Sequence, residues 1–134
     1  MFPLATPAAF VEFVMLLTGG IMGLSHIVQP GMWAEYFGAL AERGRTGVVT
    51  KIMQVELWPA LLIVSLHQVW NGPAIVVTVI GWLLLAKVAM GLLAPDLALR
   101  SMRMAERGGR SFVPAGVVLL VVSGFAGAAL VLPG

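Results

Sequence analysis

Four long apolar stretches dominate the chain, separated by short polar connectors. They cover residues 8–28, 48–70, 73–94 and 112–132. Each is close to the ~20 residues that an α-helix needs to cross ~30 Å of hydrocarbon. Valine and isoleucine runs would favour strands in water, but a segment in lipid must satisfy its own backbone, which favours a helix. The pattern therefore predicts an all-α integral membrane four-helix bundle, with residues 1–134 forming a single transmembrane domain.

Two of the connectors carry amphipathic patterns of their own, over residues 31–44 and 96–108. In the first, Trp33, Tyr36 and Phe37 fall on one helical face, and the acidic residues lie away from that face. A helix of this kind lies flat in the headgroup region of a bilayer. We therefore predict an interfacial helix in each connector, and the three aromatic residues are the expected anchors of the first.

Basic residues are confined to one side of this pattern. Seven of the eight lie in or beside the first and third connectors, namely Arg43, Arg45, Lys51, Arg100, Arg103, Arg107 and Arg110. The eighth, Lys87, lies within the third apolar stretch. Because connectors rich in Lys and Arg stay in the cytoplasm, we predict a multi-pass protein of the bacterial inner membrane with both termini on the non-cytoplasmic side. Asp96 is spaced to pair with Arg100 one helical turn later.

Composition agrees with a membrane protein and excludes several classes of function. Hydrophobic residues make up 60% of the 134 residues and charged residues 10%, against about 25% charged residues in a soluble domain. The absence of cysteine excludes thiolate nucleophiles, disulfides and cysteine-ligated zinc or iron–sulfur clusters. A formal net charge of +2 is too small to indicate nucleic-acid binding. The lipid bilayer is the partner that the composition predicts.

A short internal similarity relates the two halves of the chain. Met22-Gly23-Leu24, Pro30 and Ala41-Glu42-Arg43-Gly44 recur in order as Met90-Gly91-Leu92, Pro95 and Ala105-Glu106-Arg107-Gly108. The similarity predicts two repeated α-hairpins, related by an axis along the membrane normal. Small residues within the spans allow close helix contacts, either inside one bundle or along a seam between copies of the chain.

Charged residues inside the apolar stretches are the strongest functional signal. Glu56 and Lys87 lie equally far from the centre of the second connector, so they should meet at one depth. A lone charge there costs at least ~2.5–3.5 kcal/mol, and pairing lowers that cost. The pair either fixes the register of two helices or forms a proton or ligand site. Lys51, Gln54 and His26 lie toward the same end of their helices, and the five residues are expected to share one polar cavity.

A second polar site is predicted at the opposite, outer end of the bundle. It contains Glu12 of the first span, with His67, Gln68 and Asn71 around the second connector. Glu12 lies about one turn inside its span, so its carboxylate is expected either to snorkel to water or to face an outer cavity. His26 and His67 lie at opposite ends of their spans and cannot share a haem. No ligand spacing indicates a metal site, and no set of side chains indicates catalysis.

Three features of the chain occur together in a known layout. They are Pro30 at the end of the first span, the aromatic segment Met32-Trp33-Ala34-Glu35-Tyr36-Phe37-Gly38, and the acidic start of the second span at Gln54-Val55-Glu56-Leu57. In this architecture the whole chain resembles small bacterial DoxX-like four-helix membrane proteins. That family includes subunits linked to quinone-dependent respiratory enzymes, so the resemblance implies an accessory role near quinone chemistry.

Three functions follow from these observations. The first is a non-enzymatic accessory subunit, or a binder of lipid, quinone or partner membrane proteins, as a homo-oligomer or within a larger complex. The second is a small proton-coupled transporter with Glu56 and Lys87 as its coupling pair. Small multidrug-resistance transporters share the length and an acidic residue in the first span, here Glu12, but their two-way insertion conflicts with the charge bias. The third, a membrane-embedded enzyme, has the least support.

Overall fold

The computed structural model describes residues 6–106 and 112–132, and within these ranges it contains helices and no strands. Three long helices are unbroken: α1 (Pro7–Val28), α5 (Ala74–Leu93) and α7 (Phe112–Val131). A fourth is continuous from Arg45 to Leu66 and consists of α3 (Arg45–Lys51), the π-helix η1 (Ile52–Glu56) and α4 (Leu57–Leu66). All four are long and apolar enough to cross a membrane. The predicted all-α four-span membrane protein is therefore confirmed.

The second span differs from its predicted bounds, residues 48–70. It begins at Arg45, because Gly44 with a φ of 65° separates it from the preceding helix. It ends at Leu66, because His67 leaves the helical conformation with a φ of −130° and a ψ of 89°. The residues from His67 to Trp70 therefore belong to the connector and not to the span.

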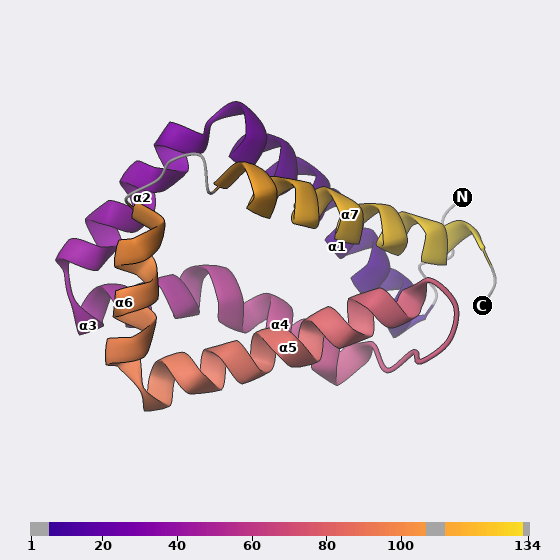
Figure 1. The fold of residues 1–134 in the computed structure, drawn as a ribbon. Helices are drawn as coiled ribbons and strands as arrows, with labels where there is room; N and C mark the ends of the chain where they lie inside the picture. Colours follow the sequence, from indigo (N-terminus) through magenta and orange to yellow (C-terminus); the bar gives the residue numbers. More distant parts are fainter. Residues whose placement is uncertain (1–5, 107–111, 133–134) are drawn as a thin grey trace.

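The long helices form two pairs, as Figure 1 shows. Helix α1 packs along α7, and α4 packs along α5. Each pair thus takes one helix from each half of the chain, whereas the two spans within a half make few contacts with each other. The predicted internal repeat stays a prediction, and two residues of its motif, Arg107 and Gly108, lie outside the described residues.

Two shorter helices, α2 (Pro30–Glu42) and α6 (Pro95–Glu106), lie across one end of the bundle, and the start of α1 and the end of α7 lie at the other end (Figure 1). Leu40 and Ala41 of α2 and Met102 of α6 are buried in one apolar cluster together with Val48 and Ile52 of the second span. The two connector helices are therefore part of the packed core, in addition to being amphipathic as predicted.

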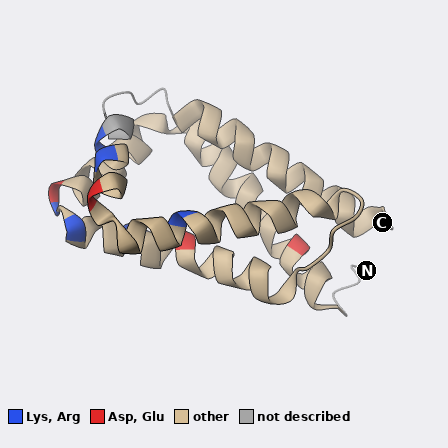
Figure 2. Ribbon diagram, turned by 60° about the horizontal axis from the view of Figure 1, so that its bottom comes forward, with Lys and Arg blue, Asp and Glu red and all other residues tan. Residues whose placement is uncertain are grey.

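Most of the charged residues gather at the end that α2 and α6 cover (Figure 2). There Arg45 forms a bidentate pair with Asp96, both bonds being 3.1 Å long, with both side chains largely exposed. The sequence predicted Arg100 as the partner of Asp96; Arg100 contributes its charge there, whereas the hydrogen bonds come from Arg45. Arg45, which is distant in the sequence, presents the planar fork that matches a carboxylate.

Helices α1 and α7 approach closely through small residues. A Cβ atom added to Gly23 would lie 2.8 Å from the carbonyl oxygen of Gly116, and one added to Gly116 would lie 2.6 Å from that of Gly23. The Ser123 hydroxyl donates a hydrogen bond to the Leu16 carbonyl at 2.6 Å. These small residues therefore serve packing inside the bundle, which is one of the two roles that the sequence left open.

Candidate functional site

Two separate clusters of buried polar side chains interrupt the apolar bundle. We call Lys51, Glu56 and Lys87 the lysine cluster, and Glu12, His67 and Thr78 the histidine cluster. Five of these six residues are at most 6% exposed, and only Lys87 reaches the surface. Buried polar groups of this kind are costly in a membrane protein and mark candidate functional sites.

The lysine cluster is organised around one carboxylate oxygen of Glu56. The Lys87 ammonium lies 2.7 Å from Glu56 Oε2, and the Lys51 ammonium lies 3.7 Å from the same oxygen. The predicted pairing of Glu56 with Lys87 is therefore present, and Lys51 joins it. The side chains of Lys51 and Glu56 are each 8% exposed, whereas that of Lys87 is 60% exposed.

The π-helix explains why Lys51 and Glu56 can meet. In a regular α-helix, residues five apart are separated by about 140° around the axis and do not face each other. Between Ile52 and Glu56 the helix is wider, and the Leu57 amide donates to the carbonyl of Ile52 five residues earlier. A π-helix brings residues five apart onto one side, and such segments are frequent at functional sites.

Pro59 lies in the first turn of α4, after this segment. Its nitrogen has no hydrogen to donate to the carbonyl of Val55, four residues earlier. One residue before the proline, the Trp58 indole donates to the carbonyl of Gln54 at 3.2 Å.

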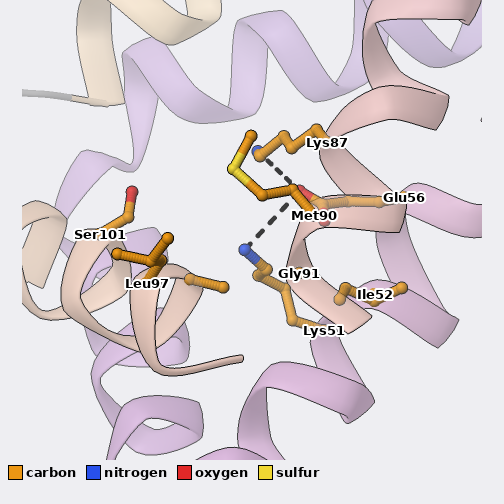
Figure 3. A pocket seen from close by; sticks show the side chains of 9 residues that line it. Lys51, Ile52, Glu56, Lys87, Met90, Gly91, Leu97 and Ser101 are labelled. Atoms are coloured by element: carbon orange, nitrogen blue, oxygen red, sulfur yellow. Dashed lines mark ion pairs between the residues drawn. The ribbon is translucent and has the colours of Figure 1, made fainter. Parts of the chain in front are cut away.

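A cavity of about 120 Å³ opens beside the lysine cluster. Its walls come from the second span, from α5 and from the start of α6. Figure 3 shows Lys51, Glu56 and Lys87 pointing toward one another, with Leu97 and Ser101 on the opposite wall. The cavity is predominantly apolar, and its polar groups are the three charged side chains and the Ser101 hydroxyl.

Two residues that the sequence assigned to this cavity lie elsewhere. The Gln54 side chain is on the exposed side of its helix, where its amide oxygen accepts a hydrogen bond from the Tyr36 hydroxyl at 3.0 Å. His26 is buried, and its Nδ1 donates to the carbonyl of Met22 at 2.6 Å. The predicted five-residue cavity is thus reduced to the three charged residues.

His26 instead belongs to a group of rings formed with α2 and α7. Its ring stacks on Trp33 with centroids 4.3 Å apart, and Phe37 stacks on Phe112 at 5.4 Å. Tyr36 meets Trp33 edge to face. The three predicted interfacial anchors are half-buried and packed on one another, so they join α2 to the bundle as well as facing outward. Offset and edge-to-face ring pairs are favourable in such positions.

The histidine cluster is fully enclosed. His67 Nε2 lies 2.7 Å from Glu12 Oε2, and His67 Nδ1 lies 2.8 Å from the Thr78 hydroxyl. The cluster joins α1, the start of the second connector and α5. Glu12 is only 6% exposed, so the expectation that its carboxylate snorkels to water is wrong. Its partner is His67, which supplies the hydrogen bond that water would otherwise provide.

Thr78 completes the histidine cluster. Its hydroxyl donates to the carbonyl of Val69 at 2.7 Å and accepts from the Val69 amide at 3.3 Å, and it lies 2.8 Å from His67 Nδ1. Among the described residues, every buried side-chain nitrogen and oxygen has a hydrogen-bond partner.

The other two residues predicted at this end stay outside the cluster. Gln68 is exposed, donates to the carbonyl of Val64 at 2.7 Å and accepts from the Trp82 indole at 3.4 Å. Asn71 is exposed in the connector. Thr78 was missed by the sequence analysis. Counting residues outward from the second connector, as was done for Glu56 and Lys87, would have placed it near the depth of His67.

An apolar layer separates the two clusters. Glu56 and His67 are eleven residues apart, or about 16 Å along the helix, and the buried residues of α4 between them are Pro59, Ala60 and Ile63. Ile63 also contacts Gly81 of α5 and is part of an apolar core with Val11 and Val77. In the part of the chain that the structure describes, no group of three or more His, Asp or Glu side chains could hold a metal ion.

No protein-family model matches the chain, and neither a curated protein nor a solved structure gives a match. The resemblance to DoxX-like proteins therefore rests on layout alone. What can be said of function comes from the geometry of the two clusters.

Proposed function

We propose that this four-span membrane protein is a non-enzymatic accessory subunit that binds an amphiphile, either a lipid or a quinone, or a partner membrane protein. The observation that carries the proposal is the cavity beside the lysine cluster, which combines charged groups with a largely apolar lining. Pockets of this kind, apolar with a few convergent polar groups, are the usual form of a binding site.

The orientation proposed from the sequence also agrees with this role. Arg43, which directly follows α2, and the basic residues of α3 and α6 lie at the end that holds the cavity, and the start of α1 and the end of α7 lie at the opposite end (Figures 1 and 2). We place the charged end in the cytoplasm of a bacterium, with both termini on the other side of its inner membrane. The cavity would then face the cytoplasmic leaflet and be reached from the bilayer.

A proton-coupled carrier is the second candidate, and the Glu56–Lys87 ion pair favours it. The apolar layer of Ala60 and Ile63 between the two clusters speaks against it, because this static arrangement offers a proton no polar path from one cluster to the other. A carrier would need a second conformation that opens the layer.

The test is extraction of the full chain from its native membrane into polymer-bounded lipid discs. Mass spectrometry of the intact particle and of its organic extract should show a retained lipid, a retained quinone or a stoichiometric protein partner. The opposite result would be a homo-oligomer without a bound amphiphile that takes up solute in liposomes under a pH gradient and loses this activity in Glu56→Gln. That result would contradict the proposal and favour the carrier.

A further inference from the structure

The lysine cluster contains one more positive charge than negative charge. Glu56 faces two ammonium groups through a single oxygen, 2.7 Å from Lys87 and 3.7 Å from Lys51. Two ammonium groups carry six N–H donors between them, and one shared oxygen cannot satisfy them all. Because a surplus charge is costly beside hydrocarbon, an anion placed next to both lysines would stabilise the cluster.

The cavity has room for a small polar group and not for a whole amphiphile. Its volume of about 120 Å³ is well below the ~300 Å³ at which pockets begin to enclose drug-sized ligands. Ser101 adds a hydroxyl to its wall, and Met90 and Leu97 line it with apolar side chains that are themselves about half exposed, 56% and 52%. A headgroup can therefore enter while its acyl chains stay outside against these apolar side chains.

The depth of the cavity also fits a headgroup. Lys87 is six residues before the end of α5 at Leu93, which is about 9 Å along the helix. Helix α6, which crosses the end of the bundle, supplies the opposite wall. Basic pockets between membrane helices at this level are the known form of sites for anionic lipid headgroups.

We infer that the cavity binds the phosphate of an anionic phospholipid between the ammonium groups of Lys51 and Lys87. The inference rests on the proposed function and names the class of its ligand. The phosphate oxygens accept hydrogen bonds from both lysines and from the Ser101 hydroxyl, and Glu56 keeps the two lysines in place without neutralising them completely.

The experiment uses the full chain in phosphatidylcholine nanodiscs with increasing amounts of phosphatidylglycerol. Native mass spectrometry reports the number of retained anionic lipids, and thermal unfolding reports the stabilisation that they give. Lys51→Gln is expected to weaken phosphatidylglycerol binding about tenfold or more, the usual effect of losing a charge-assisted hydrogen bond. Arg43→Gln is the matched control, because Arg43 is a basic residue near the same end of the bundle that does not line the cavity.

Glu56→Gln is expected to change phosphatidylglycerol binding in the opposite direction from Lys51→Gln. It removes the carboxylate that competes with the phosphate, so phosphatidylglycerol should bind more tightly and should restore the thermal stability that the variant loses. Lysines with only a structural role would give a destabilised Glu56→Gln protein that phosphatidylglycerol does not rescue.

Three further outcomes identify the source of the anion or overturn the inference. Inorganic phosphate that competes with phosphatidylglycerol at millimolar concentration would keep the phosphate site and assign it to a soluble anion. Equal weakening by Lys51→Gln and Arg43→Gln would overturn the inference, since it would reveal only a general attraction of the basic end for anionic lipid. Retention of a neutral quinone or lipid without any preference for phosphatidylglycerol would overturn this inference alone and leave the proposed function standing.

Discussion

The histidine cluster and the lysine cluster solve the same physical problem in opposite ways. In the histidine cluster, three side chains from three parts of the chain form short hydrogen bonds, and every buried side-chain polar atom has a partner. In the lysine cluster, two ammonium groups share one carboxylate oxygen, one of them is 60% exposed, and a cavity lies beside them. Both clusters put polar atoms in an apolar bundle. The first is complete without a ligand, and the second has room and charge for one.

Because of this difference, we expect the histidine cluster to contribute mainly to stability and the lysine cluster mainly to binding. A closed, fully satisfied cluster fixes helices relative to one another, and it is expected to respond to mutation through unfolding. An open cluster with unbalanced charge is expected to respond through binding. Substitutions at three places, in order of decreasing effect on stability, test whether the comparison holds.

The largest effect is expected in the histidine cluster. Glu12→Leu should lower the free energy of unfolding by ~3–5 kcal/mol, because it leaves the enclosed His67 ring without its partner. Replacing both residues with leucine should cost less than either single change, since no orphaned polar group remains. Chemical unfolding in detergent micelles would measure all three variants. A loss in the double variant equal to the sum of the two single losses would show that the two side chains do not act as a pair.

A smaller effect is expected in the lysine cluster, and it should differ between its members. Glu56→Gln should cost ~1–3 kcal/mol, because it leaves two neighbouring ammonium groups without a carboxylate. Lys87→Met should cost less than ~1 kcal/mol, since the exposed ammonium is partly solvated and Lys51 still balances Glu56. The same unfolding measurement applies. A greater loss in Lys87→Met than in Glu56→Gln would contradict the assigned geometry.

The smallest effect is expected for the exposed pair of Arg45 and Asp96, which belongs to neither cluster and serves as a reference. The hydrogen bonds from the Arg45 guanidinium, and then its charge, hold the pKa of Asp96 below its usual value. The pair therefore stabilises the protein above the ordinary pKa of Asp, and this contribution is lost as the pH falls through the lowered value. Asp96→Asn should lower the unfolding temperature slightly at pH 7.

The pH dependence of this last effect provides its check. The difference in unfolding temperature between the parent protein and Asp96→Asn should disappear when both are measured at a pH below the pKa of Asp96. A difference of the same size at low pH would mean that the asparagine acts through something other than the lost ion pair.

Features that depend on chain length and depth could be predicted from the sequence. The four spans follow from the number of apolar residues needed to cross a bilayer. The meeting of Glu56 and Lys87 follows from their equal distances to one connector, because two adjacent antiparallel helices must pair residues in that way. The close packing of α1 against α7 could not be predicted, because small residues indicate that two helices approach closely but do not identify the second helix.

Side-chain contacts that depend on an irregular backbone could also not be predicted from the sequence. Lys51 lies five residues before Glu56, and only the widened turn of η1 brings the two side chains together. Glu12 lies in the first span and His67 at the start of the second connector, and their contact depends on His67 leaving the helix at the point where α4 ends. Both arrangements arise where the backbone departs from regular helix, and regular periodicity is what a sequence pattern reports.

The pairing of α1 with α7 also constrains how the protein is made. Because α1 precedes α7 in the chain, it is synthesised earlier, and its glycine face is without its final neighbour until α7 has been inserted. Glu12 likewise precedes its buried partner His67. Biogenesis is therefore an assembly of early and late segments, in which the contact between α1 and α7 forms only after the helices between them have been made.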